Sequence, residues 1–381
     1  PGLLYAGTET GIYVSFNGGD LWQSLQLNLP NTPINDLIVH DRENDLVVAT
    51  SGRSFWILDD LSPLQQAARD VPDGDENSHH LYSPRHAYRL AGGSGFGGGG
   101  EGVNGPSGAV IDFILGEVAD AEPVAVTIKT LAGDVIRTLS TQPDQEVSPG
   151  ASALLVHTGH NRIVWNLRHE NIPNIPGAYV FGSLQGRRVI PGDYVVELSV
   201  GDWRAEEALT IRKDPRVETT LQEYVEQDQF VAQVAAELSA IHRTVSRNND
   251  VKGQIETFLD RVGDGVSAGP VTEQGELLAQ ELENVADSLY QRRVVDGQTV
   301  INFPSRLKFQ YVFLHGNADG AETGVSMGSR EVLSDLRARW TVHRAISDEL
   351  LGPRLDAFNR LIQEAGFSII IAPPRLRRPV S

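Results

Sequence analysis

The sequence predicts a multidomain protein of β plus α class, with the β structure first. Apolar and polar residues alternate with the period of half-buried strands near the start of the chain and again after a glycine-dominated stretch. From Glu218 onward the apolar residues step by three and four, as in amphipathic helices. The predicted units are an incomplete β unit (1–62), a connecting segment with a glycine-rich linker (63–108), a β-sandwich (109–214), an antiparallel helical bundle (215–366) and a C-terminal tail (367–381).

Composition is that of an ordinary globular chain, and it excludes several classes of function. Of the 381 residues, 40% are hydrophobic and 22% are charged. The apolar run Ile369–Ala372 is far shorter than the ~20 residues of a membrane span. A formal net charge of −18 disfavours nucleic acid as a partner, because phosphates would be repelled. The absence of cysteine excludes disulfides, thiol catalysis and cysteine-bound zinc.

The first 62 residues alternate as roughly six short strands. A β-propeller blade has four strands, and a closed ring needs at least ~4 blades. Six strands make about one and a half blades. We therefore expect an incomplete propeller-like unit, whose open sheet edges are covered by another domain or by a partner.

One turn in this region, Ser15–Trp22, has the sequence SFNGGDLW. Asn17 can close the turn by bonding backbone amides ahead of it, and Gly19 tolerates positive φ. Trp22 is expected to bury its ring under the turn as the chain re-enters the sheet. The predicted structural motif is therefore Ser15, Asn17, Gly19 and Trp22, without a nucleophile, acid or base among them.

The pattern Ser-x-Asn-x-Gly-x-x-Trp resembles the Asp-box of bacterial neuraminidase (BNR) repeats, where aspartate is commoner than asparagine. The resemblance extends through Leu3–Gly7, Gly11–Ser15 and Val47–Asp60. Together these segments look like the C-terminal portion of a bacterial sortilin-like, BNR-repeat protein, often labelled glycosyl hydrolase. The resemblance implies an extracytoplasmic (periplasmic or cell-envelope) location, with a signal peptide and most of a propeller lying upstream. It also places Asp-boxes on outer turns, away from catalysis.

The next two regions have simpler signatures. Pro63–Arg69 reads as a short helix, and the glycine-rich stretch lacks the lysine and following helix of a phosphate-binding loop. Over 109–214 the spacing of strands and turns favours an Ig-like sandwich. Gly159–Arg168 and Pro191–Leu198 resemble the Ig-like module of flagellar hook-cap proteins. Trp165 is the expected core anchor.

The helical region contains three apolar stripes. A break is expected at Gly352-Pro353, because the residue before proline disfavours the helical conformation. The stripes comprise Val231, Val234, Leu238, Ile241 and Val245; then Leu278, Leu282, Val285 and Leu289; then Val332, Leu336, Trp340, His343 and Leu350.

No catalytic constellation is apparent, so we do not expect this chain to be an enzyme. Sialidase chemistry needs arginines, a tyrosine and a glutamate that come from several blades of a propeller. This chain has too few blades to supply them. Arg53 is a candidate anion-binding residue, and packing over neighbouring aromatic rings is the alternative for its side chain. His157 and His160 lack the helical spacing of zinc hydrolases. Neither a metal nor a cofactor is expected.

Three functions from different classes remain open. The leading interpretation is a non-catalytic, extracytoplasmic protein-interaction or scaffold module, an accessory subunit of a larger envelope or membrane-associated complex. It would bind other proteins through its open β edges and the surface of its helical bundle, without a membrane span of its own. The alternatives are a fragment of a glycan- or peptide-hydrolysing propeller enzyme with its active site outside this chain, and a carbohydrate-binding module that uses Trp203 as a stacking platform.

Overall fold

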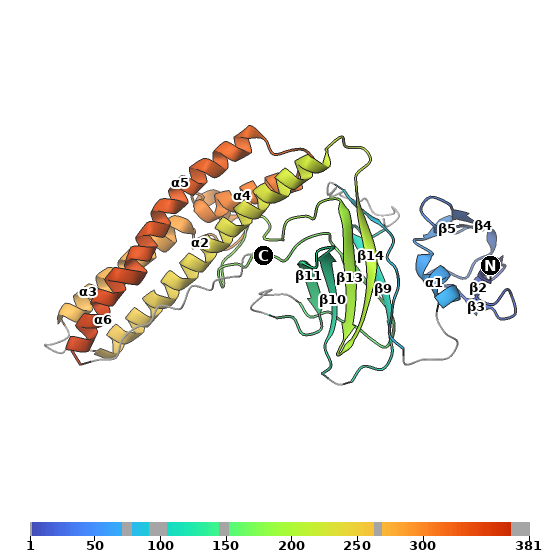
Figure 1. Ribbon diagram of the computed structural model, residues 1–381, viewed down its shortest axis with the longest axis horizontal. Helices are drawn as coiled ribbons and strands as arrows, with labels where there is room; N and C mark the ends of the chain where they lie inside the picture. Colours follow the sequence, from blue (N-terminus) through green and yellow to red (C-terminus); the bar gives the residue numbers. More distant parts are fainter. Residues whose placement is uncertain are drawn as a thin grey trace. The chain divides into compact units, whose positions relative to one another are not determined.

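A computed structural model describes residues 2–70, 78–90, 105–119, 121–144, 152–262 and 269–366. The chain is mixed β and α, with a helical C-terminal region (Figure 1). It divides into two compact units. The β unit comprises Pro1–Pro143, Ser152–Leu167 and Pro191–Asp214, and the helical unit comprises Asp144–Ala151, Arg168–Ile190 and Pro215–Ser381. Most of the predicted glycine-rich linker and all of the predicted tail lie outside the described residues.

The start of the β unit contains the six predicted strands, arranged in two three-stranded antiparallel sheets of orders β1-β2-β3 and β4-β5-β6. The predicted short helix, α1 (Ser62–Asp70), follows them. Side chains of both sheets and Leu61 form one core, in which Leu46 and Leu61 are completely buried. The strands are β1 (Leu4–Thr8), β2 (Gly11–Ser15), β3 (Gln23–Ser24), β4 (Ile34–His40), β5 (Asp45–Thr50) and β6 (Phe55–Leu58).

The rest of the β unit forms a five-stranded sheet of order β11-β10-β13-β14-β8 and a three-stranded sheet of order β12-β9-β7. Trp165 is buried and meets Tyr194 edge to face, with 6.2 Å between ring centroids, which confirms it as a core residue. The strands are β7 (His80–Leu81), β8 (Ala87–Arg89), β9 (Ala109–Leu115), β10 (Val124–Thr130), β11 (Val135–Ser140), β12 (Gly159–Trp165), β13 (Gly192–Val200) and β14 (Trp203–Lys213).

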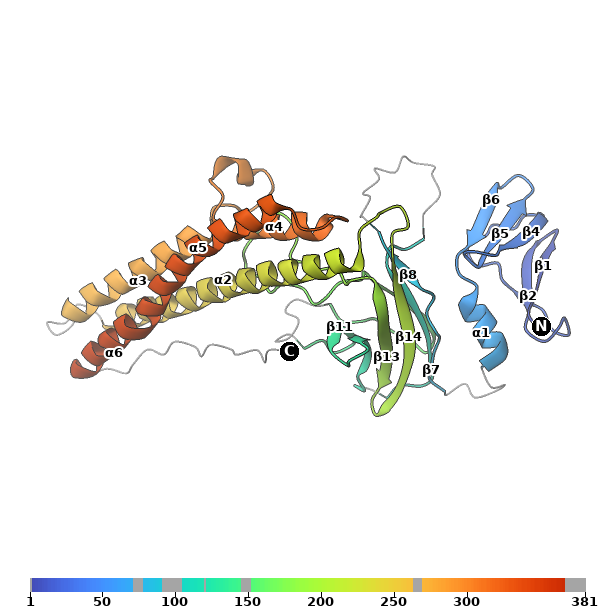
Figure 2. The same ribbon diagram turned by 45° about the horizontal axis from the view of Figure 1, so that its top comes forward.

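The helical unit is built around the long helix α2, against which α3, α4 and α5 pack. Figure 2 shows α2, α3 and α5 running beside one another for much of their length. The predicted stripes of α2 and α3 are buried, as expected. The elements are α2 (Leu221–Val262), α3 (Gly269–Leu289), η1 (Thr299–Asn302), α4 (Leu307–Gly320), α5 (Met327–Glu349), η2 (Leu350–Arg354) and α6 (Leu355–Glu364).

One detail of the third helical stripe differs from the prediction. Val332 is exposed, and Leu333 is buried in its place. Leu333, Leu336 and Trp340 lie on one face of the helix, and Val332 is rotated from Leu333 by about 100° around the helix axis. The expected break at Gly352-Pro353 is confirmed, and it takes the form of a kink. A π-helical turn, η2, connects α5 to α6 there, and Gly352 takes the non-helical angles φ −113° and ψ −105°.

Arg168–Ile190, within the range expected for the sandwich, groups instead with the helical unit. A buried charged network explains this. Arg188 donates to Glu322 Oε1 at 2.5 Å, and its backbone N–H donates to Asp319 Oδ1 at 2.7 Å. Arg168 donates to the other oxygen of Asp319 at 2.6 Å. Removing one partner of such a buried pair would be strongly destabilising, because it leaves an uncompensated charge.

Candidate functional site

The turn after β2 is closed by side chains, as predicted. Ser15 Oγ accepts the N–H of Gly19 at 2.9 Å and donates to Asn17 Oδ1 at 3.0 Å. The same Asn17 oxygen accepts the N–H of Leu21 at 2.9 Å. Gly18 and Gly19 have φ values of +75° and +106°, which a residue with a side chain rarely adopts. These hydrogen bonds and backbone angles give Ser15, Asn17 and Gly19 a structural role in the turn.

The predicted burial of Trp22 is wrong. Its side chain is 39% exposed, because it precedes the very short strand β3 and lies at the margin of its sheet. The core beneath this sheet is filled instead by Ile12 and Val14 of β2.

Arg53, the candidate anion-binding residue, lies in the exposed turn between β5 and β6. Its backbone N–H donates to Thr50 Oγ1 at 3.2 Å, and its carbonyl accepts the indole N–H of Trp56 at 2.9 Å. These bonds shape the turn. Anion binding by the guanidinium remains a prediction.

The sheet β4-β5-β6 has one feature that the sequence analysis missed. Its surface on the side opposite the core, the outer face, carries cross-strand apolar rows. Ile38 pairs with Val47, which pairs with Ile57; Ala49 pairs with Phe55 in the neighbouring row. Ile38 is 64% exposed, Ile57 60% and Phe55 74%. Side chains directly opposite each other in antiparallel strands are close enough to touch, so these residues form one apolar surface.

Both faces of this sheet are therefore apolar. Leu37, Val48 and Trp56 point into the core from the other face. An antiparallel sheet with one solvated face ordinarily alternates apolar and polar residues. The signal was present in the sequence, because LVVA and FWIL are unbroken apolar runs, which are typical of strands buried on both faces.

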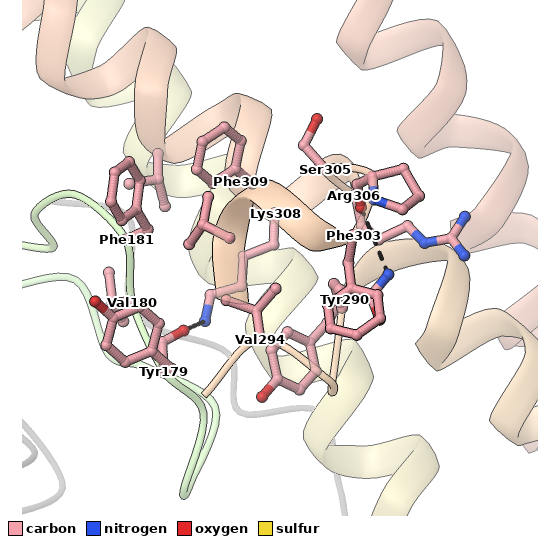
Figure 3. A pocket seen from close by; sticks show the side chains of 14 residues that line it. Tyr179, Val180, Phe181, Tyr290, Val294, Phe303, Ser305, Arg306, Lys308 and Phe309 are labelled. Atoms are coloured by element: carbon pink, nitrogen blue, oxygen red, sulfur yellow. Dashed lines mark hydrogen bonds between the residues drawn. The ribbon is translucent and has the colours of Figure 1, made fainter. Parts of the chain in front are cut away.

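The helical unit contains a pocket of about 270 Å³ between Arg168–Ile190, the region after α3 and the start of α4 (Figure 3). Its walls are largely aromatic. Phe181 stacks on Phe309 with 5.8 Å between centroids and 23° between planes, and Tyr290 and Phe303 also line it. Concave pockets with mostly apolar walls and a few polar groups are typical of small-molecule sites.

Lys308 is the polar group of this pocket, and the sequence analysis missed it. Its side chain is almost completely buried and reaches from α4 toward Tyr179 (Figure 3). The ammonium donates to Asn174 Oδ1 at 3.0 Å and to the Tyr179 carbonyl at 3.2 Å, and it lies 4.9 Å from the centre of the Tyr290 ring. Burial lowers the pKa of Lys308 to about 8. The helical sequence LKFQYVFL, with one lysine among apolar residues, was its only signal.

The described part of the chain contains no group of three or more His, Asp and Glu residues placed to hold a metal. His160 pairs with Asp112, with 2.8 Å between Nε2 and Oδ1, and Arg162 Nε binds the same oxygen at 2.8 Å. These hydrogen bonds outweigh the opposing effect of burial and lower the pKa of Asp112. The carboxylate is thus enclosed by its own partners.

Trp203, the candidate stacking platform for a glycan, is half-buried at the start of β14. Its ring meets His79 edge to face, with 5.3 Å between centroids. A sugar-stacking platform needs a free ring face. Glycan binding by this ring remains a prediction.

Comparisons with known proteins give no identification. No protein-family model matches the chain, and no curated protein is similar to it. Among solved structures, a match titled pT26-6p has 9% identity and a TM-score of 0.12, and covers 96% of this chain and 67% of its own. A similarity this weak carries no argument about the fold. None of the helices in the described ranges is long and apolar enough to cross a membrane.

Proposed function

We propose that the protein is a non-catalytic interaction module, and that the outer face of β4-β5-β6 binds an apolar sheet face of another polypeptide. The exposed row Ile38–Val47–Ile57 carries this proposal. Apolar side chains gathered in rows on a sheet are stabilised when they are removed from water, by roughly 25 cal/mol per Å². A contiguous apolar surface of this kind is typical of an interaction site.

The geometry favours a β-sheet as the occupant. The rows follow the two-residue period of strands, and two sheets pack face to face at ~10 Å by interdigitating such rows. Both β4 and β6 are edge strands of their sheet, so a partner strand can also pair with the backbone. Asp36 pairs with Ala49 and so ends the row that contains Phe55, and the chain carries a net charge of −18. Basic side chains around the partner's face would therefore complement this surface.

This proposal agrees with the resemblance drawn from the sequence. We propose that β1–β6 are part of a propeller of the sortilin-like, Asp-box type, in which each blade is covered on both faces. In the same scheme the two larger sheets form an Ig-like sandwich, the helices form an antiparallel bundle, and the protein acts outside the cytoplasm as a subunit of a larger complex. The bonds among Ser15, Asn17 and Gly19 support this scheme.

Site-specific photo-crosslinking tests the proposal. A photoreactive residue replaces Ile57 in the full protein in its source cells, and the control replaces Leu155, which is an exposed apolar residue of the same unit outside any strand. We expect a discrete crosslinked species from position 57, with the second peptide coming from a β-strand of another polypeptide. Position 155 should give none. A second variant, Ile38→Lys, should abolish the crosslink from position 57, because it places a charge within the row.

Two outcomes would overturn the proposal. If position 57 crosslinks no more than position 155, the outer face is not an interface. If the crosslinked partner is a second copy of this chain, the face mediates self-association instead of binding a different polypeptide.

A further inference from the structure

We propose that the aromatic pocket around Lys308 binds a small aromatic carboxylate, with the ring between the aromatic walls and the carboxylate at the Lys308 ammonium. This inference concerns the helical unit alone and is independent of the proposed interaction face.

The charge of the pocket points to an anion. Lys308 and Arg306 both line it, and none of its described lining residues is acidic, although the chain as a whole has 50 acidic residues and 32 basic ones. The described ion pairs do not include Lys308, whose ammonium contacts only neutral oxygens and a ring. A buried charge is costly unless it is paired, and a bound carboxylate would supply the missing partner.

The start of α4 adds to this preference. Leu307 is the first residue of α4, and Arg306, at the N-cap, provides no side-chain cap. The unpaired amides at the beginning of a helix carry a partial positive charge, which favours an anion nearby. In addition, Arg306 Nε is buried and has no hydrogen-bond partner among the described residues.

The walls select a flat apolar ring. The Phe181–Phe309 stack presents aromatic surface to the pocket, and Phe303 adds a ring with one face covered by Arg293, at 4.7 Å from its centre. Aromatic rings favour offset stacking or edge-to-face contact with a bound ring. A pocket of about 270 Å³ is slightly below the ~300 Å³ at which drug-sized sites begin, so a ligand of one or two rings fits it. A single carboxylate is favoured over a phosphate, because a doubly charged group would lose more hydration in this apolar surrounding.

The experiment compares 2-naphthoate with 2-naphthamide, which has nearly the same shape but no charge. Binding of each to the full protein is measured by calorimetry. We expect the wild-type protein to bind the carboxylate about tenfold more tightly than the amide, the ratio that ~1.4 kcal/mol provides. In Lys308→Met the carboxylate should lose about that tenfold while the amide keeps its affinity. The matched control Lys252→Met removes a lysine of α2 paired with Glu256 and Glu283, and should leave both affinities unchanged.

A measurement on the wild-type protein keeps the test valid if Lys308→Met does not fold. Affinity for the carboxylate should fall between about pH 7 and about pH 9, as the ammonium loses its proton, while the affinity for the amide stays constant. The ionisable groups around Lys308 are Tyr179, Tyr290, His242 and Arg306. Burial keeps the pKa of Tyr290 above its ordinary value and that of His242 below its own, so neither titrates in this window.

The proposal fails if neither compound binds, or if the carboxylate and the amide bind the wild-type protein equally. It also fails if Lys308→Met folds and retains the preference for the carboxylate, or if the carboxylate affinity of the wild-type protein does not change with pH. In these cases Lys308 only ties Arg168–Ile190 to α4 through its bonds to Asn174 and Tyr179.

Discussion

The sheet β4-β5-β6 and helix α2 are both rich in apolar residues but use them differently. In α2, apolar side chains form a single stripe that is buried within the helical unit, and polar residues cover much of the remaining surface. In the sheet, apolar side chains occupy both faces, and only one of them is buried in the chain itself. The apolar stripe of α2 is thus covered by other elements of the helical unit, whereas the sheet exposes one apolar face.

The difference shows what kind of information a periodic pattern contains. Periodicity predicts which residues share a face, because it follows from backbone geometry. It does not say whether that face is covered, since covering depends on elements far away in sequence or on another molecule. An unbroken apolar strand therefore predicts two faces in need of contact, and the structure then shows which one the chain provides.

The largest expected effect comes from replacing an isoleucine by alanine in each of the two regions and comparing the loss of stability. Ile241→Ala should lower the free energy of unfolding of the helical unit by about 2–5 kcal/mol, because Ile241 is 0% exposed and its loss leaves a cavity. Ile38→Ala, at a residue 64% exposed, should change the stability of the β unit by less than ~0.5 kcal/mol. Native-state hydrogen exchange resolves the two units separately.

Equal losses from the two substitutions would contradict the comparison. A large cost at Ile38 in the isolated protein would mean that the outer face is already covered within the chain. A small cost at Ile241 would mean that the helical core relaxes around the missing atoms.

The sequence predicted the features that depend on local spacing, and it did not predict those that depend on distant parts of the chain. The stripe of α2, the core position of Trp165 and the closing bonds of Asn17 depend on local spacing and were predicted correctly. The burial of Trp22 was mispredicted, because the length of the strand that follows a turn is set by its sheet partners. The Lys308 pocket could not be predicted, since it brings together residues from about 179 to 312 that no local pattern relates.

A second prediction tests the helical unit by acid. His242 is buried in α2 and has 2.6 Å between its Nδ1 and the Pro173 carbonyl oxygen, and burial lowers its pKa to about 4. In the unfolded chain the pKa returns to ~6.5, so between these values the unfolded state binds the additional proton. Stability of this unit should therefore fall as the pH drops through that window, by about 2 kcal/mol at pH ~4.5–5 from this group.

His242→Asn serves as the control for that slope, because its amide can reach the same carbonyl but does not titrate. The substitution will shift stability at every pH, so the informative quantity is the difference in slope between pH ~6.5 and ~4. If the slopes of wild type and variant coincide, His242 does not contribute to acid sensitivity. His169 and His315 also have lowered pKa values caused by burial, and they should leave a residual slope in the variant.

The smallest expected effect concerns the turn after β2, which Asn17 closes with its side chain. Only the Oδ1 atom of Asn17 is used, since it accepts from Ser15 Oγ and from the Leu21 N–H. A carboxylate would accept the same two bonds with charge assistance. Asn17→Asp should therefore stabilise the β unit by less than ~1 kcal/mol at neutral pH, and this gain should disappear as the pH falls below ~4.

Asn17→Ala removes both bonds and should destabilise the β unit by ~1 kcal/mol. Thermal melts of the three proteins at neutral and acidic pH measure both effects. If Asn17→Asp destabilises the turn at neutral pH, the site excludes negative charge, and this turn does not tolerate the commoner residue of the motif it resembles.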